Sequence, residues 1–184
     1  MEENFVSMSE ALAKMSEEMK ARLANIWEDA IKITGETEAN LPVNNKNISI
    51  GHPTAKLNKA ISEVLGTEIN AKEQNITLRQ AWHINDKHGV GNEKYMDQNP
   101  VTKETFMLIP DVLENFSTVE IGRGTKDSRK QDTRSIVIGR IYSDGTVILA
   151  NALAGIGKLE IKTMVLKKPT EVSPMNANAP SGSL

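Results

Sequence analysis

The sequence contains no cysteine and few aromatic residues. Without cysteine the chain can form no disulfide, no thiolate metal site and no cysteine nucleophile, which suits a reducing cytoplasm. Aromatic residues make up only 4% of the 184 residues, so the core must consist of Ile, Val, Leu, Ala and Met. No apolar run is long enough to cross a bilayer, and the N-terminus lacks the pattern of a signal peptide. These absences predict a soluble domain of ordinary size.

A strong net charge is also absent, but the charges are unevenly distributed. The formal net charge is −2. Residues 1–45 hold nine acidic and four basic residues, a net of −5, whereas residues 120–170 hold ten basic and five acidic residues, a net of +5. A basic segment of this density can bind an anionic partner, although a solvated face of a sheet explains it equally well.

Residues 1–40 predict an amphipathic helical arm. Apolar residues recur at spacings of three and four over residues 2–33, which predicts one long helix that Gly35 and Pro42 bring to an end. The narrow, Met-rich stripe suits a second copy of the chain or the rest of a larger polypeptide. Packing of the stripe on its own domain is an equally good interpretation.

The periodicity then changes from helical to strand-like. Helices are predicted over residues 54–65 and 78–88 and after Thr102, with a bend at Pro110. Strands with a period of two are predicted over residues 118–123, 134–142, 146–153 and 158–166. Helices followed by an antiparallel meander predict an α+β domain over residues 43–168. Residues 169–184, rich in Pro, Ser and Asn, predict a linker or a disordered tail.

Two of the three histidines, His83 and His88, lie five residues apart in the predicted helix 78–88. Five residues correspond to about 140° around a helix axis, so the two imidazoles cannot bind one metal ion, and no metal site is predicted. The helix dipole favours protonated His88 in the last turn, where it can donate a proton or neutralise a phosphate. Capping of the last carbonyls by His88 and a half-buried structural role for His83 are the alternatives.

An ordered series of motifs within residues 43–168 resembles a family of nucleases. The motifs are "ISIG", "HINDKHG", "TKETFMLIPDVLENF" and "KLEIKTMVLKKP". In this order they are similar to the phage-associated barnase–EndoU–colicin–RelE-like nucleases, small domains of polymorphic toxins and of large phage or mobile-element polypeptides. The resemblance implies N-terminal helices packed on a roughly four-stranded antiparallel sheet, with the active site on the exposed face of the sheet.

The resemblance also implies the activity, that of an endoribonuclease that needs neither a metal nor another cofactor. A base would remove the proton of a ribose 2′-OH, and an acid would protonate the leaving 5′-oxygen. The implied partners are RNA, with tRNA among the candidates, and an inhibitor or immunity protein; the lack of a long apolar run separately predicts no membrane partner. The implied location is the cytoplasm of a bacterial host, reached as part of a larger polypeptide. A non-catalytic phage or mobile-element module with a nuclease-like fold is the alternative.

The resemblance assigns site residues by motif. His83 and His88 match the helical histidines, and the last-strand motif matches at Lys162 and Thr163. The remaining candidates are strand residues, expected beside the phosphate or base: Arg140 as a catalytic cation, and Arg123, Arg134, Tyr142 and Lys158 as RNA contacts. A plain edge strand with solvated arginines is the alternative for the strand 134–142.

Strand alternation completes the expected site. It puts Arg140 and Tyr142 on one face of their strand, where guanidinium can bind phosphate and the ring can stack on a base. It also puts Lys162 with Glu160 on one face, and Thr163 on the other with Leu159 and Ile161. Glu160 and Glu120 are the candidate general bases by strand position alone. The site requires the imidazoles and the strand cations to converge on a single open groove.

Overall fold

The computed structural model describes residues 4–33, 47–91, 96–122, 133–154 and 157–169, which form helices and one mixed sheet. The helices are α1 (Met8–Lys14), α2 (Glu17–Ile31), α3 (Ala55–Leu65), α4 (Leu78–His88), α5 (Lys103–Phe106) and α6 (Ile109–Glu114). The strands are β1 (Asn47–Ser49), β2 (Glu73–Thr77), β3 (Gln98–Asn99), β4 (Thr118–Ile121), β5 (Thr133–Tyr142), β6 (Gly145–Ala154) and β7 (Lys158–Lys167). The fold is α+β, as the sequence predicts.

The sheet is larger than the four antiparallel strands expected. It has seven strands in the order β1-β2-β7-β6-β5-β4, with β3 paired to the end of β7. Strands β4 to β7 form the predicted antiparallel meander, whereas β2 pairs with β7 in parallel. The local sequence of β2 indicates an extended segment but not its partner, because a parallel neighbour is always distant along the chain.

The N-terminal helical segment consists of two helices and not of the one long helix predicted. Met15 is extended, and the Ser16 side chain accepts a hydrogen bond of 3.2 Å from the Met19 amide, so that Ser16 starts α2 as an N-cap. Both helices contribute to the same core as the sheet, with Leu23 and Trp27 buried. The apolar stripe therefore packs on its own domain, which is the second of the two interpretations of the sequence.

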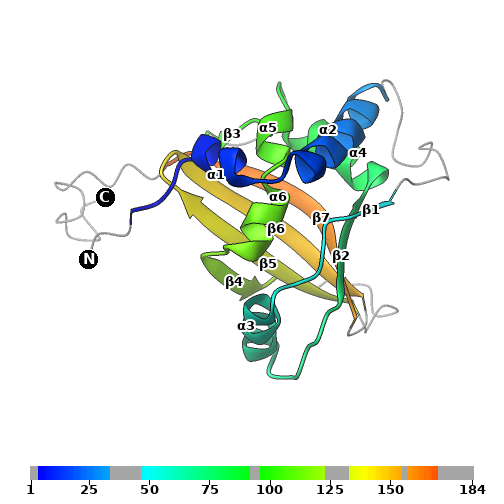
Figure 1. Cartoon of the computed structure of the whole chain (residues 1–184), viewed down its shortest axis with the longest axis vertical. Helices are drawn as coiled ribbons and strands as arrows, with labels where there is room; N and C mark the ends of the chain where they lie inside the picture. Colours follow the sequence, from blue (N-terminus) through cyan, green and yellow to red (C-terminus); the bar gives the residue numbers. More distant parts are fainter. Residues whose placement is uncertain (1–3, 34–46, 92–95, 123–132, 155–156, 170–184) are drawn as a thin grey trace.

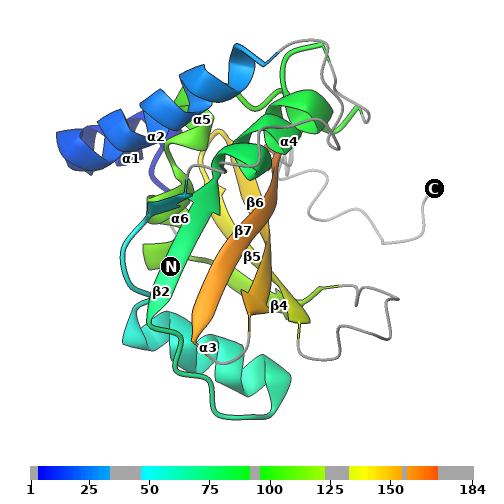
Figure 2. The same ribbon diagram turned by 90° about the vertical axis from the view of Figure 1, so that its right-hand side faces the viewer.

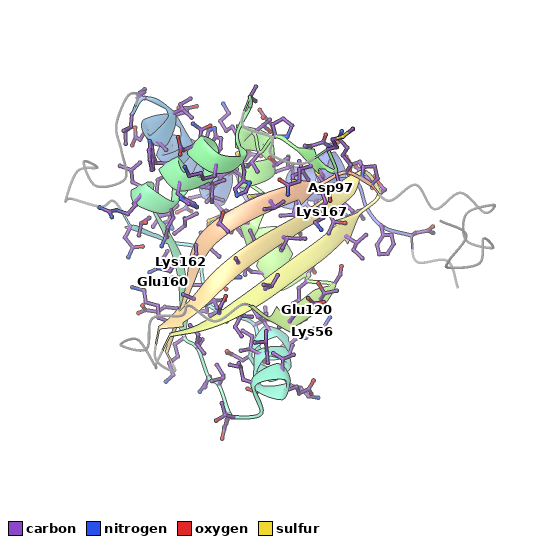
Figure 3. The ribbon with its side chains drawn as sticks, turned by 180° about the vertical axis from the view of Figure 1, so that it is seen from behind. Lys56, Asp97, Glu120, Glu160, Lys162 and Lys167 are labelled. Carbon is purple, nitrogen blue, oxygen red and sulfur yellow. The ribbon has the colours of Figure 1, made fainter. Side chains whose placement is uncertain are left out.

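One face of the sheet is covered by helices. Figure 1 shows α1 and α6 in front of the sheet, and Figure 2 places α1, α2, α5 and α6 on the same side. Seen from behind in Figure 3, the middle of β5, β6 and β7 is not crossed by any of the helices that the structure describes. We call these two sides the helix-covered face and the uncovered face.

Burial distinguishes the two faces along each strand. Leu149 and Met164, which pair across β6 and β7, are fully buried and lie on the helix-covered face. Their neighbours Ile148 and Val165 pair in the next row and are only half-buried, as expected for the uncovered face. Each strand residue can therefore be assigned to one face from its register.

Candidate functional site

A β-bulge in β7 determines which way the predicted site residues face. Thr163 pairs with Ala150 on β6, and Ile161 pairs with Asn151, so Lys162 has no partner on that strand. An extra residue of this kind shifts the alternation of side chains by one position. The burial pattern agrees with the shift, since the buried residues of β7 are Leu159, Ile161, Met164 and Leu166.

The bulge corrects the predicted orientation of Thr163. Strict alternation places Thr163 with Leu159 and Ile161, but after the bulge Thr163 lies on the uncovered face, as Glu160 does before it. The sequence prediction was wrong here because no local signal in "LEIKTM" marks the extra residue. Bulges are frequent beside active sites, where they redirect side chains.

Glu160 lies between two lysines of β7. Its carboxylate is 2.9 Å from Lys162 Nζ and 3.6 Å from Lys158 Nζ, and the Glu160 side chain is 25% exposed. Figure 3 labels Glu160 and Lys162 side by side along β7. Burial acts to raise the pKa of Glu160, but the hydrogen bonds and charges of Lys162 and Lys158 outweigh it, so the pKa lies below its ordinary value. The cluster combines an ionised carboxylate with two ammonium groups that can reach an anion.

Two buried polar atoms lie beside this cluster. Asn75 on β2 pairs with Glu160 in the strand register, so both side chains lie on the same face. Among the described residues, Asn75 Oδ1 and Thr163 Oγ1 are buried and have no hydrogen-bond partner. Buried polar atoms are normally satisfied, so each exception calls for an explanation, such as an ordered water, an ion or a catalytic role.

The two histidines of α4 do not lie on the same side of the helix. His88 is one and two turns from the buried residues Ile84 and Ala81, so it is on the side of α4 that packs into the protein. His83 lies on the outer side with the exposed Arg79 and with Lys87. Helix α4 contacts α2, β2 and β7, and the His88 carbonyl accepts a hydrogen bond of 2.7 Å from the Val101 amide. The structure thus gives the two imidazoles different surroundings.

Arg140 and Tyr142 lie on the helix-covered face, away from the Glu160 cluster. Arg140 Nη1 is 2.7 Å from Asp111 Oδ2 on α6, and the Tyr142 hydroxyl donates to the same oxygen at 2.6 Å. Burial, followed by the hydrogen bond to Asp111, raises the pKa of Tyr142. Tyr142 is buried, so its ring cannot stack on a base, and in the part of the chain that the structure describes Arg140 and Tyr142 share no groove with the Glu160 cluster.

Only one of the remaining predicted RNA contacts can be placed in the Glu160 cluster. Lys158 belongs to the Glu160 cluster. Arg134 lies on β5 opposite Leu153, but its side chain is outside the part that the structure describes, as is the whole of Arg123. Of the predicted site residues, the structure therefore brings together Lys158, Lys162 and Thr163.

A cavity on the helix-covered side contains a histidine that sequence reasoning missed. The cavity has a volume of about 710 Å³ and lies between α1, α6 and the segment that links β1 to α3. His52 lines it, with its Nδ1 2.6 Å from the Lys72 carbonyl oxygen. The only signal for His52 was its place in a Gly-His-Pro turn, which is common in loops without a function.

Comparison of the chain with protein-family models, curated proteins and solved structures finds no match. Within the described ranges, no group of three or more His, Cys, Asp or Glu side chains could hold a metal ion. The described helices are all too short or too polar to span a membrane.

The lysines of the cluster can be tested by titration. The substitution Lys162→Ala is expected to raise the pKa of Glu160 toward its ordinary value, because it removes the largest contributions that lower it. Carboxyl carbon shifts in an NMR pH titration would measure the change. Lys167→Ala is the control: this lysine lies on the same strand but is not one of the two ion-pair partners of Glu160, so its substitution is expected to leave this pKa unchanged. An unchanged pKa in Lys162→Ala would show that the ion pair does not persist in solution.

Proposed function

We propose that the uncovered face binds RNA and cleaves it without a metal ion, by attack of a ribose 2′-OH on the adjacent phosphorus. The observation that carries the proposal is the position of the Glu160 carboxylate between two lysines, on the same face as Thr163. An open sheet face suits an extended polymer, and ammonium groups neutralise phosphate. The proposal keeps the activity that the resemblance to the phage-associated nucleases implies. It takes the cations from β7, where Lys158 and Lys162 lie, and not from Arg140 on β5.

In this mechanism Glu160 is the general base. An incoming phosphate competes with the carboxylate for Lys158 and Lys162, so that the ion pairs of Glu160 weaken when RNA binds. Loss of these pairs raises the pKa of Glu160, which makes it a stronger base at the moment when the 2′-OH is deprotonated. The lysines then stabilise the charge of the pentacovalent phosphorane.

The remaining roles fall to polar groups near β7. The Thr163 hydroxyl has no partner among the described residues and is covered in the free chain, so it can donate to a non-bridging phosphate oxygen only after binding of RNA uncovers it. We assign the general acid to His88 because it matches a helical histidine of the resembled family; its carbonyl accepts from the Val101 amide near β3, which pairs with the end of β7 away from Glu160, so the role requires His88 and the cluster to approach each other when RNA binds. RNA is the partner in this proposal, tRNA is one candidate substrate, and a toxin role in a bacterial cytoplasm with a cognate inhibitor would follow from the activity.

The test is digestion of single-stranded RNA by the purified chain in excess EDTA. The expected products carry 2′,3′-cyclic phosphate or 3′-phosphate ends and 5′-hydroxyl ends, because the 2′-OH is the nucleophile. DNA of the same sequence is the control and is expected to stay intact, since it lacks the 2′-OH. Cleavage of DNA, 5′-phosphate ends, or binding of RNA without cleavage would contradict the proposal; the last result would favour a non-catalytic module.

A further inference from the structure

The cavity on the helix-covered side is a second candidate site, on the opposite side of the sheet from the Glu160 cluster. Its volume of about 710 Å³ lies within the range of small-molecule sites, about 300–1,000 Å³. Its wall is divided between apolar side chains, among them Met15, Met19 and Ile50, and polar ones such as His52 and Gln74. A ligand that fills it therefore needs both an apolar surface and hydrogen-bonding groups.

The charges that line the cavity balance one another. Arg140 is paired with Asp111, and that carboxylate also accepts hydrogen bonds from Tyr142 and from Asn115 Nδ2 at 3.0 Å. One further basic residue, Lys14, and one further acidic residue, Glu114, line the cavity. Because two acidic residues offset two basic ones, the cavity does not favour a strongly charged ligand such as a polyphosphate.

Two side chains that line the cavity, His52 and Gln74, carry acceptor atoms that a ligand donor could satisfy. Because a carbonyl oxygen can only accept, His52 Nδ1 donates to Lys72, which leaves Nε2 of the neutral ring as an acceptor. Gln74 Nε2 donates to the Ile50 carbonyl at 3.1 Å, which fixes its amide orientation, and within the described residues the buried Oε1 has no partner. Gln74 is only 6% exposed and Oε1 has almost no accessible surface, so a ligand reaches this oxygen only when the side chain shifts toward the cavity.

We propose that this cavity binds an uncharged nucleoside. A nucleobase supplies a flat apolar ring, for which methionine thioethers such as those of Met15 and Met19 are favourable neighbours. Its amino and ring N–H groups, together with the ribose hydroxyls, supply the donors that His52 Nε2 and Gln74 Oε1 lack. The proposal does not rest on RNA cleavage, because none of the Glu160 cluster lines the cavity.

The test is an NMR titration of the ¹⁵N-labelled chain with adenosine, guanosine, cytidine and uridine at millimolar concentration. Saturable shifts are expected at the amides of Gly51, His52 and Leu113, all of which line the cavity. His52→Ala is expected to weaken binding by about tenfold, the effect of one lost hydrogen bond. His83→Ala, on the outer side of α4, is the matched control and is expected to bind as the wild type does.

A second variant makes the result independent of any effect of His52→Ala on folding. Met15→Trp is expected to fill part of the cavity and abolish binding, while Glu160→Gln is expected to leave binding unchanged. The proposal is overturned if none of the four nucleosides gives saturable shifts or if the shifts map to β7. It is also overturned if adenosine 5′-phosphate binds more than about tenfold tighter than adenosine, because an anion would then be the recognised group.

Discussion

Replacing Glu160 with glutamine is expected to lower the rate of RNA cleavage by about 10²–10⁴-fold, the usual contribution of a general base. Glutamine has the same shape and can still accept a hydrogen bond from Lys162, but it cannot take the proton of the 2′-OH. The fold should be unaffected, since Glu160 lies on the uncovered face and not in the core. Single-turnover cleavage of a labelled oligoribonucleotide, followed at saturating protein, would measure the chemical step.

Glu120→Gln is the matched control. Glu120 lies on β4 opposite Val137, which puts it on the same uncovered face, and it is labelled there in Figure 3. It is exposed and distant in strand order from β7, so its substitution should change cleavage by no more than a few-fold. If Glu120→Gln lost activity and Glu160→Gln kept it, the base would lie at the other end of the sheet, and the role given to the β7 cluster would be wrong.

A pH dependence follows from the lysines around Glu160. Because its pKa is lowered in the folded chain, ionised Glu160 stabilises the fold at pH values above its unfolded pKa, and this contribution is lost as the pH falls. The same shift lets the unbound chain keep the base ionised well into the acidic range. In the RNA complex the pKa of Glu160 is higher than in the free chain. Cleavage at saturating RNA should therefore be lost at a higher pH than the pH at which Glu160 of the free chain takes up its proton.

Sequence patterns predicted the class of fold because helical and strand periods are local properties. The meander from β4 to β7 follows from alternation and from short turns such as Ser143-Asp144-Gly145. The parallel pairing of β2 with β7 could not be predicted in the same way. The two strands are far apart in the sequence, and neither contains a pattern that identifies the other as its partner. Serine is a common N-cap residue, so Ser16 could have indicated the start of a second helix. The apolar spacing continues without interruption on both sides of Ser16, however, and this predicted one helix.

The candidate site was predicted less well than the fold, for two physical reasons. The bulge at Lys162 moves Thr163 to the uncovered face, and a bulge leaves no local sequence signal. Alternation correctly grouped Arg140 with Tyr142, but it could not show that their common face is the one that α6 covers with Asp111. Which face of a sheet is covered is a tertiary property, and arginine on a strand is compatible with either face.

Asp111→Ala is expected to destabilise the chain by about 3 kcal/mol, since removal of one partner leaves a buried charge uncompensated. Asp111 and Arg140 have side chains that are 11% and 15% exposed, and the same carboxylate is the partner of the Tyr142 hydroxyl. Urea unfolding should show a lower midpoint with an unchanged slope. Glu114→Ala, on the same helix but exposed, is the control and is expected to change stability by less than about 0.5 kcal/mol.

Replacing the whole network separates its structural role from catalysis. In the variant Asp111→Leu, Arg140→Met and Tyr142→Phe no buried charge or hydroxyl is left unpaired, so most of the stability lost in Asp111→Ala should return. Because these residues lie on the helix-covered face, the triple variant should also cleave RNA at nearly the wild-type rate. A stable triple variant without activity would show that at least one of Asp111, Arg140 and Tyr142 acts on the substrate, and the reaction would then have to take place on the helix-covered side of the sheet.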